Sequence, residues 1–253
     1  MSKYLKVDYK NSILELTIDR EDAGNALNNK LMKLMNEAFI KYRDESSIKL
    51  VIIRGSGEKF FVAGGDLKEL SSVREEKETE EMALRGRTML DQIRYFPVPV
   101  IACLNGYALG GGAELAMACD YRVACETAKF GFIHSTLGIT TAWGGIIDLI
   151  ESIGSSKALA ILIEGKMMNA KDAQMIGIIE HVESNHEELE RKINDLKYIY
   201  RSMSLDIIRG NKLITSKYKK ELHKSLKHLE LDSFKQSWMS QHHWDKVEQL
   251  LSK

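Results

Sequence analysis

The chain lacks a net charge. Its 253 residues include 36 Lys and Arg and 36 Asp and Glu, so the formal charge at pH 7 is +0. A strongly positive field is what draws a protein to nucleic acid or to an anionic membrane. We therefore expect neither nucleic acid nor membrane among the partners of this protein, although a local basic cluster could still lie at one mouth of a site.

Long uncharged apolar runs are also missing, and the residues after Met1 and Ser2 already mix charged with apolar side chains, as an edge strand does. A secretory leader needs an apolar stretch in this region, so we expect a cytoplasmic protein. With 44% hydrophobic residues, the chain can bury a substantial core as one domain with a small helical extension.

Cysteine is scarce. Cys103, Cys119 and Cys125 are odd in number and lie in apolar stretches, which favours reduced core cysteines over a disulfide framework or a metal site. The pair His242 and His243 has no matching ligand spacing around it, so we predict a surface pair and no bound metal.

The most informative segment that is present runs from Asn105 to Leu115. It places three consecutive glycines at a strand-to-helix corner, with Glu114 just inside the helix. Glycine lets a ligand approach the backbone closely, and the first amides of a helix are unpaired at the positive end of its dipole. Such a corner suits an oxygen that acquires negative charge. A structural turn or a dinucleotide phosphate loop could also explain the glycines, but they lack the Gly-x-Gly-x-x-Gly spacing of such a loop.

A second corner lies at residues 59–70. An apolar strand end is followed by small residues, then by Asp66 as a candidate N-cap, with Leu67 and Leu70 at helical spacing. Two corners thus offer backbone amides. Two donors that converge on one oxygen suit acyl-transfer or enolate chemistry, in which the loss of one donor costs roughly 3 kcal/mol of transition-state stabilisation.

Strands and helices alternate along the chain, which predicts an α/β fold. The predicted strands are residues 13–18, 50–54, 100–104 and 121–124. Residues 28–43 predict an amphipathic helix whose inner face carries Leu31, Leu34, Ala38 and Tyr42. From Glu187 onward the chain is rich in Glu, Lys and Leu, a helical composition in which Phe234, Trp238 and Trp244 offer anchors for packing or assembly.

Together the two corners resemble the paired signature of the crotonase (enoyl-CoA hydratase/isomerase) superfamily. Further motifs stand in the family's order and spacing: Asn25-Ala26-Leu27, Pro97 to Ala102, Cys119 to Arg122, Phe130-Gly131 and Ala170 to Gly177. The resemblance covers roughly residues 10 to 185. It implies a crotonase-type ββα superhelix as an acyl-CoA-binding core at 1–185, a helical C-terminal region at 186–253 for trimerisation or core cover, and a homotrimer or hexamer (a dimer of trimers).

The resemblance also implies an acyl-CoA thioester substrate, whose carbonyl oxygen is held in an oxyanion hole by the amides of Gly65 and Gly111. Coenzyme A is then part of the substrate, and no separate cofactor is expected. Glu114 and His134 occupy the catalytic positions at which hydratases of this family have two glutamates. The other implied substrate-binding residues are Ala26, Ala63, Asp66, Leu67, Lys68, Ile133 and Trp143.

His134, followed by Trp143-Gly144-Gly145, resembles the branch that decarboxylates ethylmalonyl-CoA and methylmalonyl-CoA. Loss of carbon dioxide leaves a thioester enolate that two amides can hold, and it needs no carboxylate to activate water. Burial in an apolar pocket is expected to raise the pKa of Glu114, so that its neutral form could donate a proton. We favour a malonyl-type acyl-CoA decarboxylase, with an enoyl-CoA hydratase/isomerase of fatty-acid β-oxidation as the alternative.

Three of these features also fit a purely structural interpretation. His134 could be a packing histidine of the core, and Lys68 could be an exposed lysine rather than a contact to the nucleotide end of coenzyme A. The charged run 75–81 predicts a solvated helix face, or by family resemblance a lid over the acyl pocket. The whole chain could likewise be a noncatalytic CoA-binding or RNA-associated homologue, but the presence of both corners and Glu114 argues against it.

Overall fold

The computed structural model describes residues 3–252, and Met1, Ser2 and Lys253 lie outside them. A six-stranded main sheet has the order β1-β2-β3-β5-β7-β10. β1 and β2 are antiparallel, whereas the other neighbouring pairs are parallel. The strands are β1 Leu5–Lys10, β2 Ile13–Ile18, β3 Leu50–Gly55, β5 Val100–Leu104, β7 Tyr121–Cys125 and β10 His181–Glu183.

A smaller sheet has the order β4-β6-β8-β9. Its strands are β4 Phe60–Val62, β6 Tyr107–Leu109, β8 Lys129–Gly131 and β9 Met168–Asn169. Along the chain a main-sheet strand is followed by a small-sheet strand and then by a helix, in the successive units β3-β4-α2, β5-β6-α4 and β7-β8-α5. This repeat is the predicted ββα superhelix, and the predicted α/β fold class is confirmed.

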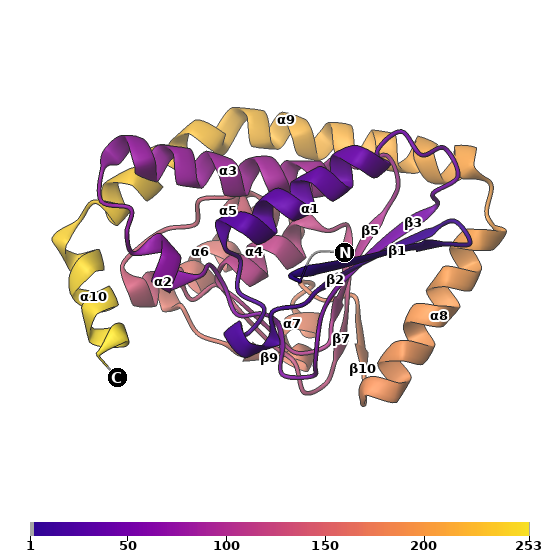
Figure 1. Ribbon diagram of the computed structural model, residues 1–253, viewed down its shortest axis with the longest axis horizontal. Helices are drawn as coiled ribbons and strands as arrows, with labels where there is room; N and C mark the ends of the chain where they lie inside the picture. Colours follow the sequence, from indigo (N-terminus) through magenta and orange to yellow (C-terminus); the bar gives the residue numbers. More distant parts are fainter. Residues whose placement is uncertain (1–2, 253) are drawn as a thin grey trace.

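The helices surround the sheets and extend beyond them. Their bounds are α1 Asn29–Tyr42, α2 Leu67–Leu70, α3 Glu76–Arg94, α4 Gly111–Ala118, α5 Gly145–Ile153, α6 Ser155–Glu164, α7 Ala170–Met175, α8 His186–Ser202, α9 Leu205–Trp238 and α10 Gln241–Leu251, with short 3-10 helices η1 Glu21–Ala23 and η2 His134–Leu137. Figure 1 shows α1, α3 and α9 side by side at the top, α8 at the right next to β7 and β10, and α10 next to the C-terminus.

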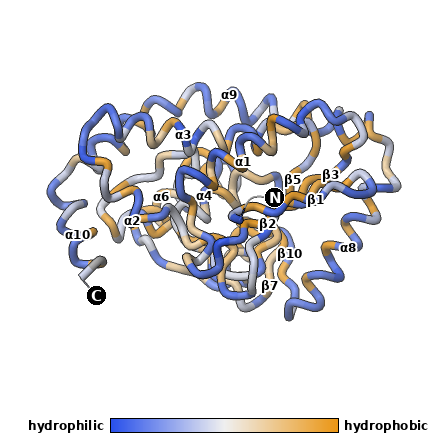
Figure 2. Tube along the Cα trace, in the orientation of Figure 1, coloured by the Kyte–Doolittle hydropathy of each residue, from blue (hydrophilic) through white to orange (hydrophobic). Residues whose placement is uncertain are grey.

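The core lies on both faces of the main sheet. Every residue of β5 is buried, as expected for a parallel strand covered on both sides. On one face, Leu189 and Ile193 of α8 pack against a cluster that includes Ile52 and Ile101, and the helices of the superhelix cover the other face. Figure 2 shows the apolar strands of the sheet and, along α9, stretches of hydrophilic colour interrupted by apolar residues.

Most predicted elements are confirmed, but the buried face predicted for the helix at 28–43, α1, is partly wrong. β2 and β5 coincide with the predicted strands, whereas β3 and β7 each run one residue further. Asn28 caps α1 by accepting a hydrogen bond from Leu31 N. Leu34 and Tyr42 are only half-buried, and the buried face of α1 instead includes Met32, Met35 and Phe39. The buried arc is wider because α1 packs against α3 as well as the sheet.

The three cysteines are free and buried, as predicted. The predicted surface pair of histidines is wrong for His243, which is 0% exposed and packs its ring 4.5 Å from those of Trp238 and Trp244. His242 is exposed. Between residues 3 and 252, no helix combines the length and the apolar character that crossing a membrane requires.

Candidate active site

The two glycine corners lie next to each other at the ends of paired strands. Gly64 follows β4 and Gly110 follows β6, with φ of +131° and +52° respectively, a region that favours glycine. β4 and β6 are parallel neighbours, so both chains leave the small sheet at the same edge. A Cβ built at Gly111 would lie 3.3 Å from the amide nitrogen of Gly65. The two segments singled out from the sequence are therefore adjacent in space.

The Gly65 and Gly111 amides are positioned to bind a ligand. Gly111 opens α4, so its N–H has no acceptor within that helix. At the other corner, Leu27 N donates to Gly64 O at 2.8 Å and Asp66 N donates to Leu27 O at 2.9 Å. Because amides alternate in direction along extended backbone, the Gly65 amide points away from Leu27. Both glycines line one cavity, and their role as oxyanion donors stays a prediction.

The indole of Trp143 packs against both corners. A Cβ at Gly111 would lie 2.4 Å from Trp143 Cζ3, and one at Gly65 would lie 3.7 Å from Cη2. On α3, a Cβ at Gly86 would lie 2.1 Å from Trp143 Nε1. Trp143 is only 6% exposed. Glycine on each side of the ring makes room for it, and the ring forms a wall beside the corner amides.

Glu114 projects from a helix in which all eight residues are buried. Its Oε2 accepts hydrogen bonds from the Trp143 and Gly145 amides, both at 2.9 Å. Its Oε1 lies 3.2 Å from His134 Nε2. A carboxylate can only accept, so Nε2 is the protonated ring nitrogen in this contact.

The charge state expected for Glu114 from the sequence is wrong. Burial on its own would raise the pKa of Glu114, but the hydrogen bond and charge of His134 and the amides of Gly145 and Trp143 outweigh it. The pKa therefore lies below its ordinary value, and Glu114 is ionised at neutral pH. The apolar surroundings of Glu114 are real, but His134 and the two amides of the loop at 143–145 together outweigh them.

His134 opens η2, and its side chain is 11% exposed. The ring lies 5.9 Å from that of Phe132, and it lines the same cavity as Glu114. The packing against Phe132 is what a core histidine would show, but the contact with Glu114 places His134 within the candidate site. Its participation in catalysis stays a prediction.

These groups surround a cavity of about 510 Å³. The structure brings together on its walls most of the residues that the sequence analysis named: Ala63, Gly65, Leu67, Gly111, Glu114, Ile133, His134 and Trp143. Three others do not line it. Ala26 is buried, Lys68 is exposed, and the Asp66 carboxylate pairs with Arg20 at 2.8 Å. Asp66 does precede α2, but its side chain makes no capping hydrogen bond.

The sequence analysis missed the far wall of this cavity, which comes from the C-terminal helices. Phe234 and Trp238 of α9 and Lys246, Gln249 and Leu250 of α10 line it. The Trp238 Nε1 donates to Val73 O at 3.0 Å, which ties the end of α9 to the segment between α2 and α3. The buried aromatics predicted as packing anchors were the available signal, but their spacing does not reveal which surface they cover.

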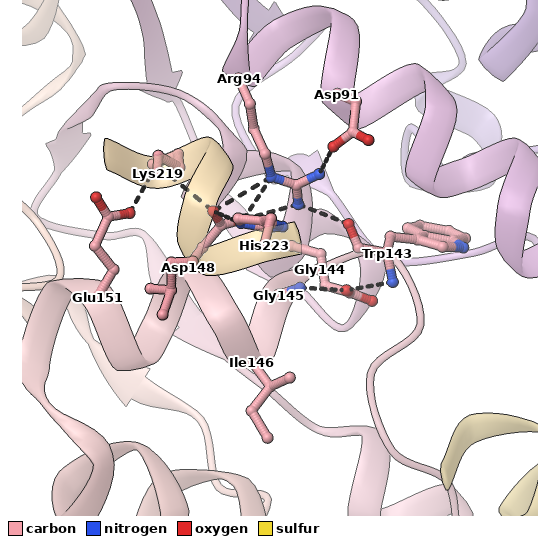
Figure 3. A network of polar contacts seen from close by, with 12 residues as sticks. Asp91, Arg94, Trp143, Gly144, Gly145, Ile146, Asp148, Glu151, Lys219 and His223 are labelled. Atoms are coloured by element: carbon pink, nitrogen blue, oxygen red, sulfur yellow. Dashed lines mark hydrogen bonds and ion pairs between the residues drawn. The ribbon is translucent and has the colours of Figure 1, made fainter. Parts of the chain in front are cut away.

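A buried ionic network holds the Trp143 loop from behind (Figure 3). Arg94 donates to the Trp143 carbonyl at 2.6 Å and to Asp148 at 2.8 Å, and both ionic side chains are 0% exposed. His223 of α9 lies 2.9 Å from Asp148 as well. The loop that supplies the amides for Glu114 is thereby fixed to α3, α5 and α9.

Comparison with known proteins agrees with this geometry. The model of the enoyl-CoA hydratase/isomerase family matches residues 8–248. The chain is 36% identical over 231 residues to carnitinyl-CoA dehydratase of Proteus mirabilis, which covers 85% of this chain and 87% of that protein. It is 38% identical over 188 residues to crotonyl-CoA hydratase of Syntrophomonas wolfei, with 72% of each protein covered.

A solved structure of similar architecture is the enoyl-CoA hydratase from Bacillus anthracis. It superposes with a TM-score of 0.79 at 31% identity, covering 89% of this chain and 91% of that one. The match to the family model, over residues 8–248, takes in both glycine corners and most of the C-terminal helices.

Proposed function

The chain belongs to the enoyl-CoA hydratase/isomerase family, and from that premise we propose that it catalyses the reversible addition of water to the double bond of a 2-enoyl-CoA thioester. The observation that carries the proposal is the ionised Glu114 carboxylate on the wall of the cavity that also exposes the Gly65 and Gly111 amides. The names of two relatives, a dehydratase and a hydratase of CoA thioesters, support the same reaction class.

In this proposal the thioester carbonyl oxygen accepts hydrogen bonds from Gly65 N and Gly111 N. Addition of water at Cβ moves the double-bond electrons toward that oxygen and forms an enolate. Donors fixed in place before the reaction stabilise such charge without reorganising, and each is worth roughly 3 kcal/mol. The buried Trp143 ring keeps the backbone of the two corners dry on one side.

Glu114 moves the proton. As an ionised base it takes a proton from water while the water oxygen bonds to Cβ, and the same proton then passes from Glu114 to Cα, so that the elements of one water are added. His134 Nε2 is already engaged with Glu114, which makes His134 the group that keeps the carboxylate ionised and oriented. One carboxylate assisted by a histidine thus replaces the expected pair of glutamates.

Malonyl-type decarboxylation receives less support from these contacts. Its substrate brings a carboxylate into the cavity, where an ionised Glu114 would repel it at short range. The proton donor that we expected from a neutral Glu114 is also missing at neutral pH. The relatives described above are named for hydration and dehydration of CoA thioesters.

The test is to incubate the purified protein with crotonyl-CoA and, separately, with methylmalonyl-CoA and ethylmalonyl-CoA, and to follow the thioesters by mass. We expect crotonyl-CoA to gain one water while both malonyl thioesters stay intact. Loss of carbon dioxide without hydration would replace this proposal by decarboxylation. Inactivity on all three would favour another enolate reaction, such as double-bond isomerisation, or a noncatalytic CoA-binding role.

We also propose that the chain assembles into a trimer or a pair of trimers. Leu159 and Ile163 lie one turn apart on α6 and are 61% and 72% exposed, and Met175 at the end of α7 is 78% exposed. A second copy that covers the exposed side of α6 would bury Leu159 and Ile163. Light scattering is expected to give the mass of three or six chains, whereas a monomer at micromolar concentration would contradict the assembly.

A further inference from the structure

Glu230 lies on α9, more than a hundred residues from Glu114 in sequence, and is 6% exposed. Its Oε1 accepts a hydrogen bond from Gly144 N at 3.2 Å and another from the Thr141 hydroxyl. Its Oε2 pairs with Arg87 of α3. A carboxylate buried with three donors is fully engaged, and none of these contacts is part of the cavity wall described above.

The contacts of Glu230 interlock with those of Glu114. Glu114 accepts from the amides of residues 143 and 145, and Glu230 accepts from the amide between them. Two carboxylates from different helices therefore hold three consecutive amides of one turn. Moving the middle peptide changes the direction of both of its neighbours, because the peptide units are planar.

The Thr141 side chain adds two hydrogen bonds to this arrangement. Its hydroxyl donates to Glu230 and accepts from Ile146 N at 3.3 Å, so the start and the end of the loop are joined through one side chain. Arg94 independently fixes the Trp143 carbonyl, on the other side of the same peptide bond that carries Gly144 N. The Trp143–Gly144 peptide is thus held at its oxygen by Arg94 and at its nitrogen by Glu230.

We propose that Glu230 is a positioning residue for the reaction: from α9 it holds the Gly144 amide and thereby aims the neighbouring amides that fix Glu114. The role of Glu114 as the base rests on the proposed function, whereas the contacts of Glu230 do not. Burial and the charge of Glu114 raise the pKa of Glu230 to about 7, which agrees with the closeness of the two carboxylates across the turn.

Two double variants test this role. Both remove the Arg87–Glu230 ion pair, and they differ only in whether residue 230 still has an oxygen that can accept from Gly144 N. Arg87→Met/Glu230→Gln keeps a side-chain oxygen for Gly144 N, while Arg87→Met/Glu230→Met has the same length and no such acceptor. Neither leaves a buried unpaired charge, so both are expected to fold. Glu221→Gln, on the exposed side of α9, is the control and is expected to behave as wild type.

With crotonyl-CoA, the Gln double variant is expected to keep kcat within a few-fold of wild type. The Met double variant is expected to lose about 10- to 100-fold in kcat with KM within a few-fold, because a misplaced base slows chemistry more than it weakens binding. Glu230→Asp, which shortens the acceptor but keeps the charge, serves if either double variant fails to fold, and it is expected to lower kcat in the same way. Equal kcat in the two double variants, or wild-type kcat in Glu230→Asp, would overturn the proposal.

Hydrogen exchange separates this inference from the proposed function, since it needs no substrate. The amides of residues 140–147 are expected to exchange at least about tenfold faster in the Met double variant than in the Gln double variant or Glu221→Gln. If wild type has no hydratase activity, the proposed function fails while the exchange comparison still tests Glu230. Unchanged exchange in the Met double variant would overturn the positioning role whatever the substrate is.

Discussion

Gly145 and Glu114 are in such close contact that residue 145 has no room for a side chain. A Cβ there would lie 2.4 Å from Glu114 Cγ and 2.8 Å from its Oε2. At the same time Gly145 N donates to that oxygen at 2.9 Å. The glycine therefore both permits the approach of the carboxylate and holds it in place.

Gly145→Ala is expected to displace the Glu114 carboxylate and to lower kcat by about 100-fold, with KM changed only a few-fold. The new methyl group would clash with Glu114, which has little room to move because every residue of α4 is buried. Steady-state kinetics of the purified variant check this. A variant with wild-type kcat would show that the position of Glu114 does not limit the reaction.

Glu114→Gln is expected to reduce turnover by about 10²- to 10⁴-fold, because the amide cannot accept a proton from water. The affinity for the CoA thioester should stay within a few-fold, since the oxyanion amides are untouched. Single-turnover rates and binding titrations measure the two effects separately. Full turnover in this variant would remove Glu114 from the mechanism.

The pH dependence of kcat/KM is expected to reflect the lowered pKa of Glu114. The base is ionised above that pKa, so the rate should stay level through neutral pH and fall only below the ordinary value of 4.5. In His134→Ala the hydrogen bond and charge that lower this pKa are lost, and the acid limb should move to higher pH. An acid limb that stays in place, with a lower thermal stability alone, would make His134 a packing residue.

Asp148 is expected to contribute to stability in a pH-dependent way. Burial on its own would raise its pKa, but Arg94, Lys219 and His223 outweigh burial and lower it. Its stabilising contribution is therefore present above the unfolded pKa, near 3.8, and is lost as the pH falls from there toward the folded pKa.

Asp148→Asn is the corresponding variant, and it leaves the buried Arg94 with Asp91 as its remaining acidic partner. It should lower the free energy of unfolding at pH 7 by about 3 to 5 kcal/mol. Urea titrations at pH 7 and at about pH 2.5, below the unfolded pKa, test both statements. Equal stability of wild type and variant at pH 7 would contradict them.

Gly210→Ala offers a stabilising change away from the site. Gly210 lies within α9, is exposed, and a Cβ there would meet no atom within 4 Å. Alanine should raise the free energy of unfolding by about 0.5 to 1 kcal/mol through its helix propensity. Thermal unfolding checks the direction, and kcat should not change. A lower melting temperature would mean that α9 is strained at this point.

The sequence predicted the parts of the fold and site that depend on local pattern. The strand Val100–Leu104 is apolar throughout because it is covered on both faces, and the glycine corners follow such strands directly. The charge of Glu114 could not be predicted in the same way. It depends first on His134 and then on the amides of Gly145 and Trp143, which meet Glu114 only in the folded chain.

The role of Glu230 could not be predicted from the sequence. In sequence it is one glutamate in a segment rich in Glu, Lys and Leu, where such residues usually face solvent. Its burial follows from the docking of α9 on α3, which no local spacing encodes. Ala26, Asp66 and Lys68 do not line the cavity, and their expected contacts to a substrate stay a prediction.

The wall of the cavity that α9 and α10 provide has a consequence for biosynthesis. A growing chain can complete both glycine corners, Glu114 and His134 long before Phe234 and Leu250 leave the ribosome. Until then the pocket is open on one side and the Gly144 amide has no carboxylate to hold it. The protein is therefore expected to become active only after α9 and α10 have folded onto the earlier part of the site.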